Sequence, residues 1–165
     1  MTWLVIIFGL FVIISPLFWV RSTPQERKKE AMRSLARQAG IRVVLQKRPD
    51  AREDETRIEA VCYRLLWRLK RPDQFWVLHR FSDRGWESGI SGWQVLNGEL
   101  DDFLIAKLSS MVEKLPETVS AVICDSAGIG LVWKETDDKA TFEVIREILH
   151  NLQDYLEKKH PTLDQ

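Results

Sequence analysis

The sequence contains few of the residues from which reactive and metal-binding sites are built. Among 165 residues there are two cysteines and three histidines, and 24 basic side chains balance 24 acidic ones. Two cysteines are too few for a disulfide-rich secreted scaffold. Cys62 and Cys124 form no CxxC pair, and no two histidines have metal-ligand spacing, so we expect no metal site. Zero net charge excludes a globally basic nucleic-acid-binding protein.

A phosphate-binding glycine motif is also lacking. The nearest candidate, residues 125–130, has neither the GxGxxG pattern of dinucleotide-binding loops nor the lysine of a P-loop. Its composition is typical of a hairpin turn. Ser126 lacks the G-x-S-x-G context of a nucleophilic serine. We therefore predict that the protein is not an enzyme and has no catalytic residues and no cofactor.

Apolar residues are concentrated at the N-terminus. Residues 2–20 are nineteen positions without a charge, and a helix of that length spans about 28 Å, close to the hydrocarbon thickness of a bilayer. Trp3 and Trp19 stand near its ends, where indole rings favour the membrane interface. A buried core helix would carry polar positions, and a cleaved signal peptide would begin with basic residues. We predict a transmembrane anchor over residues 1–20.

The charge distribution predicts the orientation of this anchor. Residues 21–48 hold nine lysines and arginines, with Glu26 and Glu30 as the acids. The positive-inside rule places such a segment in the cytoplasm and leaves the N-terminus outside. From residue 50 onward the balance reverses to 15 basic and 22 acidic residues. Cys62 and Cys124 would then face a reducing compartment and remain free thiols.

Residues 21–40 are predicted to form a basic juxtamembrane helix. Thr23 and Glu26 make a capping box around Pro24, and Gly40 is a natural stop. The basic side chains are either solvated residues that fix the orientation or contacts to anionic lipid headgroups. The candidate headgroup contacts are Arg21, Arg27, Lys28, Lys29 and Arg33. Nucleic acid is not a predicted partner, because the segment lacks aromatic residues for base stacking.

Residues 41–165 are predicted to form an α+β domain in the cytoplasm. Apolar runs predict strands over 41–46, 75–81, 119–124 and 129–134, and one short strand near Trp86 within the turn-rich segment 82–98. Residues 57–70 fit both an alternating strand and an amphipathic helix; we favour a strand in a hairpin with 75–81. Apolar stripes predict helices over 100–115 and 137–159. Helices on one face of an antiparallel sheet make a two-layer domain.

Tryptophan supplies the candidate binding residues of this domain. Trp67, Trp76 and Trp133 fall on predicted strands and are expected in the core. Trp86 and Trp93 lie in the glycine-rich segment, and loops carry binding residues more often than cores do. They are the candidate partner-binding residues. The alternative is a loop packed by its own aromatic side chains.

The first 45 residues contain a series of motifs in a distinctive order. An apolar stretch with Pro16-Leu17-Phe18-Trp19 is followed by Thr23-Pro24-Gln25-Glu26-Arg27, a basic helix and Gly40-Ile41-Arg42-Val43 before a strand. This pattern resembles a family of uncharacterised single-pass inner-membrane proteins of proteobacteria, which implies the bacterial inner (plasma) membrane and no particular activity. The run from Pro24 to Glu30 is also similar to the small accessory subunit of the bacterial preprotein translocase. However, Arg42-Val43-Val44 stands where that family has a Gly-Gly-Ile strand motif.

Together these features predict a non-enzymatic interaction or accessory protein that is anchored in the membrane. Its expected partners are membrane lipid, through the anchor, and another protein, through the cytoplasmic domain. The alternative function is a domain that senses a small ligand or an anionic lipid headgroup through the basic segment and the glycine-rich loop.

Overall fold

The computed structural model describes Trp3, Ile6 and residues 23–52, 59–68, 75–136 and 138–159. The chain divides into two compact units, Met1–Ala31 and Met32–Gln165, and the second contains the sheet. The predicted anchor over residues 1–20 lies outside the described residues except for Trp3 and Ile6. Of the helices in the described ranges, none has the length and apolar content that a bilayer span requires.

The basic helix forms as its sequence predicts. Helix α2 covers Pro24–Gln38. The backbone N–H of Thr23 donates to Glu26 Oε2 at 2.7 Å, and the backbone N–H of Glu26 donates to the Thr23 hydroxyl oxygen at 3.3 Å. These two bonds confirm the capping box. Gly40 follows the helix with a φ of 73°, a left-handed conformation that glycine adopts without strain.

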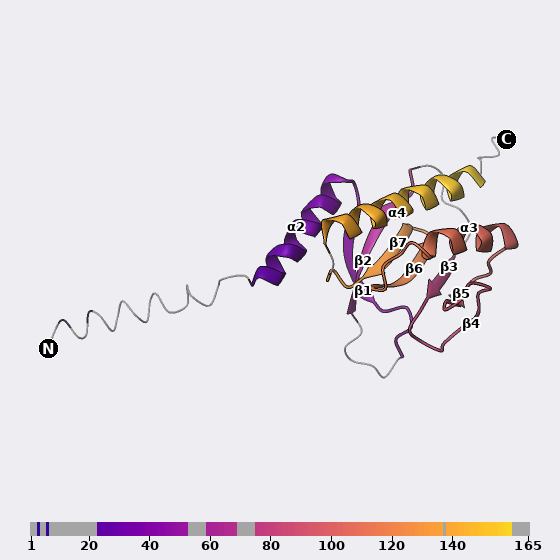
Figure 1. Ribbon diagram of the computed structural model, residues 1–165, viewed down its shortest axis with the longest axis horizontal. Coiled ribbons are helices and arrows are strands. Elements are labelled where there is room, and N and C mark those ends of the chain that lie inside the picture. The colour runs from indigo at the N-terminus through magenta and orange to yellow at the C-terminus, as the bar shows by residue number, and fades with distance from the viewer. Residues whose placement is uncertain are drawn as a thin grey trace. The chain divides into compact units, whose positions relative to one another are not determined.

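The described strands form one antiparallel sheet of seven members. They are β1 (Arg42–Lys47), β2 (Glu59–Leu66), β3 (Trp76–His79), β4 (Trp86–Glu87), β5 (Gln94–Asn97), β6 (Val119–Asp125) and β7 (Gly128–Trp133). Their order is β1-β2-β7-β6-β3-β5-β4, so β1 and β4 are the edges (Figure 1). The structure confirms the strands expected over 41–46, 119–124 and 129–134 and the short strand at Trp86. Within the ambiguous segment 57–70, the described residues Glu59–Leu66 form a strand rather than a helix.

The predicted hairpin between residues 57–70 and 75–81 is wrong. β2 pairs with β1 and β7, whereas β3 pairs with β5 and β6. The β6–β7 hairpin lies between them, and its turn is closed by Asp125 Oδ1, which accepts from the backbone N–H groups of Ala127 and Gly128. β7 is buried at all six positions and β6 at most of its seven, the pattern of strands with neighbours on both sides.

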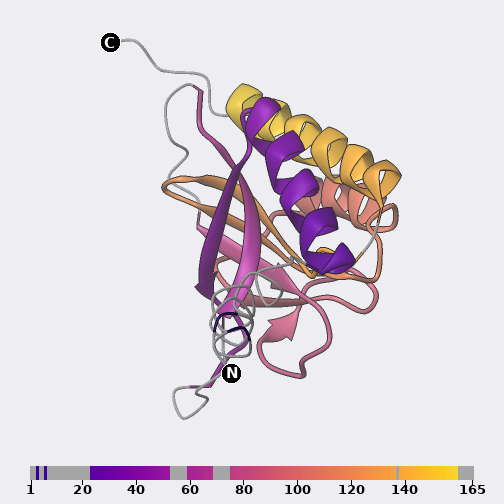
Figure 2. The ribbon, with the colours of Figure 1, turned by 90° about the vertical axis from the view of Figure 1, so that its left-hand side faces the viewer.

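The helices cover one face of this sheet. Helix α3 covers Asp102–Val112 and α4 covers Lys139–Lys159, which confirms the two helices predicted from apolar stripes. Figure 2 shows α3 and α4 on the same side of the strands. Met32 and Ala36 of α2 are buried in the same core. A smaller buried cluster lies on the other face of the sheet and consists of Cys62, Val77, Ala121, Ile123 and Val132.

Candidate functional site

One row of apolar side chains crosses the whole sheet on its helix-covered face. Directly paired residues of antiparallel strands point to the same face. The register joins, in order, Val43, Tyr63, Leu131, Val122, Leu78, Val95 and Trp86. The members from Tyr63 to Val95 are at most 6% exposed, whereas Trp86 is 70% exposed. The core row thus continues past the helices and ends in an uncovered indole ring.

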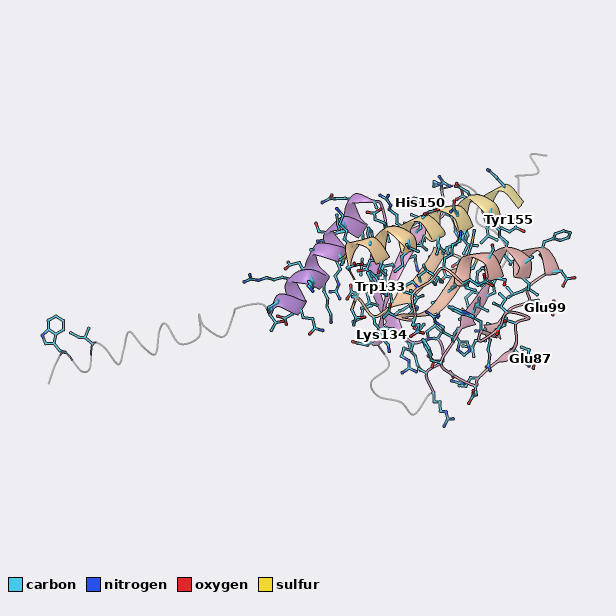
Figure 3. The ribbon with its side chains drawn as sticks, viewed as in Figure 1. Glu87, Glu99, Trp133, Lys134, His150 and Tyr155 are labelled. Atoms are coloured by element: carbon cyan, nitrogen blue, oxygen red, sulfur yellow. The ribbon has the colours of Figure 1, made fainter. Side chains whose placement is uncertain are left out.

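A hollow of about 640 Å³ lies beside Trp86. Val95, Leu100 and Ile105 give it apolar walls, and Glu87 and Glu99 add carboxylates. Figure 3 shows the two glutamates on the same side of the domain. An apolar hollow with an acidic rim suits a partner's apolar side chain flanked by basic residues.

Helix α3 and the turn before it position the walls of this hollow. The Asp101 side chain caps the helix by accepting the backbone N–H of Leu104 at 2.9 Å, which fixes the first turn that carries Ile105. Gly98 has a φ of 76°, and a Cβ atom there would lie 2.0 Å from the carbonyl oxygen of Phe75. A glycine is therefore needed where the chain turns from β5 toward α3.

The structure separates the two candidate tryptophans. Trp93 is 6% exposed and belongs to the helix-side core. The guanidinium carbon of Arg80 lies 4.8 Å from the Trp93 ring centroid and 5.0 Å from that of Phe81. Arg80 also donates to the backbone carbonyls of Pro116 and Val119. Trp93 therefore holds the loop in place, and Trp86 is the tryptophan that a partner can reach.

A buried carboxylate joins α2 to the sheet. Glu135 is 4% exposed, and its Oε1 accepts from the Tyr63 hydroxyl at 2.7 Å and from Arg33 Nε at 2.8 Å. Its Oε2 accepts from Arg33 Nη2 at 2.7 Å. Burial and the bond to Glu135 raise the pKa of Tyr63, and the bond to Glu135 raises the pKa of Arg33. These three groups stabilise one another, and the three hydrogen bonds commit Glu135 to holding Arg33 and Tyr63.

The predicted headgroup contacts differ in their surroundings. Arg33 is committed to Glu135. Arg27 and Lys28 are exposed, and Lys29 is half-buried. Arg21 lies outside the described residues. The hypothesis of lipid contact therefore depends mainly on the first turns of α2.

The cysteines are placed where a thiol is unreactive. Both are buried, and burial raises the pKa of Cys62 to about 11 and that of Cys124 to about 12. Little thiolate is therefore present at neutral pH. The two side chains belong to clusters on opposite faces of the sheet. Within the described part of the chain, no three His, Cys, Asp or Glu side chains are grouped to hold a metal ion.

The fold and the surface define a two-layer α+β domain with an acid-rimmed apolar hollow at one edge of its sheet. Comparison of the chain with family models, curated proteins and solved structures finds no match. The hollow combines β4, β5 and the start of α3, segments that the sequence pattern did not connect. Part of the signal was present, because Leu100 begins the apolar stripe of the predicted helix and Gly98 marks the turn before it.

Proposed function

We propose that this protein is a membrane-anchored interaction protein whose α+β domain binds another protein through the surface around Trp86. The observation that carries the proposal is the 70% exposure of Trp86 at the end of a row of core residues. Burying a large aromatic side chain contributes about 1.5–3 kcal/mol. Tryptophan is also enriched among the residues that dominate the energy of protein interfaces.

The charge around the hollow specifies the partner further. Glu87 and Glu99 line it, and Asp102 stands at the exposed start of α3. A partner segment that inserts one apolar side chain and places lysine or arginine over the glutamates would match this surface.

Membrane anchoring is the second part of the proposal. It rests on the uncharged run over residues 2–20 and on the basic residues that follow it. Alkaline carbonate washing of membranes should leave the intact chain in the pellet; its recovery in the supernatant would contradict anchoring. A reporter fused after Gln165 should be active on the cytoplasmic side, and activity confined to the outside would reverse the proposed orientation.

Site-specific crosslinking in native membranes tests the partner surface. A photoreactive amino acid at position 87 of the full chain, next to Trp86 and lining the hollow, should give a discrete adduct with one protein, and adding Trp86→Ala should abolish that adduct. Val144→Ala is the matched control, because Val144 is also apolar, is 37% exposed and lies on α4, outside both edge strands. Both changes are at exposed positions and should alter stability by less than about 0.5 kcal/mol. Recovery of the uncrosslinked monomer alone would refute the proposal.

A further inference from the structure

The two edges of the sheet are protected to different degrees. An edge strand presents unpaired N–H and C=O groups, and proteins blunt such edges by shortening or charging them. β4 has two residues, whereas β1 has six. The four central residues of β1, from Val43 to Gln46, carry no charge. Val44 is 38% exposed and Leu45 is 60% exposed.

We propose that β1 is a docking edge that receives an extended segment of another protein as an additional strand. In the described part of the chain, β1 pairs with β2 alone, so no described strand occupies its other side. An edge strand of this kind can accept a partner's strand. This surface lies at the opposite edge from Trp86 and does not depend on the function proposed above. Main-chain hydrogen bonds would supply much of the affinity, and the flanking charges would supply the selectivity.

The charges on β1 specify an acidic partner. Arg42 and Lys47 stand at its two ends and are exposed. Residues 37–50 contain four basic residues and one acid, Asp50, which is paired with Arg48 at 2.6 Å. A segment with an apolar, β-branched centre and an acidic residue at each end would place opposite charges across the new pair.

A second copy of this chain fits the same edge poorly. Antiparallel pairing of β1 with itself sets Arg42 opposite Lys47 at both ends. Parallel pairing in register sets each basic residue against its own copy. Like charges directly opposite each other destabilise a strand pair. The occupant inferred here is therefore a different, acidic protein segment rather than a symmetry mate.

Hexapeptides binding to the full chain in detergent micelles test this inference. The probe has four alternating Val and Thr residues between two glutamates, and its matched control has two lysines instead. The glutamate probe should bind about tenfold more tightly than the lysine probe. The double variant Arg42→Glu/Lys47→Glu should reverse this preference. Lys114→Glu/Lys134→Glu, the same change of charge at exposed lysines outside β1, should preserve it.

Backbone N-methylation of the probe identifies the mode of binding. Alternate amides of a strand face opposite sides, so methylation of one set should abolish binding and methylation of the other should leave it intact. Trp86→Ala should bind the probe unchanged, which separates this site from the one at the other edge. The inference would be overturned if the glutamate probe did not bind. It would also be overturned if the two double charge variants changed the probe preference equally, or if the probes methylated on either set of amides bound equally well. A dimer in sedimentation experiments that Leu45→Arg dissociates would also overturn it in favour of a second copy.

Discussion

Replacing Arg33 by methionine should lower the stability of the domain by about 2–3 kcal/mol. The change keeps most of the aliphatic stem and removes the guanidinium that donates two hydrogen bonds to Glu135, at 2.7 and 2.8 Å. Glu135 would retain the Tyr63 hydroxyl as a donor. Its carboxylate would nevertheless lose its positive partner in a position where the side chain is only 1% exposed.

The expected magnitude follows from the unequal burial of the two partners. Breaking a fully buried ion pair from one side costs about 3–5 kcal/mol, because an uncompensated charge remains inside. The Arg33 side chain is 43% exposed, so water can enter beside Glu135 and replace part of the lost interaction. Tyr63→Phe removes one bond to the same charged group and should cost about 1.5–3 kcal/mol. Glu135→Gln combined with Arg33→Met removes both charges and should cost less than the sum of the single changes, with a coupling of about 1–2 kcal/mol.

Thermal unfolding of the full chain in a mild detergent, followed by tryptophan fluorescence, measures these differences. For a domain of this size the loss expected for Arg33→Met corresponds to a decrease in Tm of about 5–10 °C. Hydrogen exchange should also accelerate at the backbone amides of residues 32–38, which this ion pair holds to the sheet. An unchanged Tm, or additive single and double changes, would refute the assignment of Arg33 to a structural ion pair. Recovery of the Tm of the Arg33→Met variant on addition of anionic lipid would also refute this assignment.

Two further predictions concern the thiols and the turn glycines. Because the pKa values of Cys62 and Cys124 are raised to about 11 and about 12 in the folded state, their contribution to stability is complete below about pH 9 and decreases as the pH rises. Between pH 9 and 11, the free energy of unfolding measured with a chemical denaturant should decrease by up to about 1.4 kcal/mol per pH unit for each thiol. Cys124→Ala should reduce this slope, and a free energy of unfolding that does not change with pH would contradict the prediction. Gly98→Ala should cost at least about 2 kcal/mol in thermal unfolding, because its Cβ would meet the Phe75 carbonyl oxygen. Gly92→Ala has a similar φ of 74° but open space around the Cβ position and should cost about 1 kcal/mol, so equal losses would exclude the steric explanation.

Most elements of this fold are predictable from the sequence because their signals are local. The capping box of Thr23 and Glu26 marks the start of α2, and apolar stripes at helical spacing mark α3 and α4. Pairing between distant strands carries no such signal. A short connection between β2 and β3 suggests a hairpin. However, β6 and β7 are apolar on both faces, so they bury the most apolar surface when they lie between β2 and β3.

The candidate site was predictable only in part. Trp86 and Trp93 share the same glycine-rich setting, and the sequence cannot distinguish them. Their difference arises from the register, which places Trp86 on the edge strand, and from Arg80, which covers the ring of Trp93. Glu135 was missed because its partners lie 102 and 72 residues away in the sequence.

The zero net charge of the chain conceals two edges of opposite character. The β4 edge combines Trp86 with Glu87, whereas β1 combines an apolar centre with Arg42 and Lys47. Exposed charges are screened beyond about 10 Å at 0.1 M salt, so electrostatic selection acts only on a segment already in contact with one edge. If the two proposals hold, the two edges would select partner segments of opposite charge at close range, and one protein segment would not satisfy both. If both edges are occupied, the domain joins two different segments rather than two copies of one.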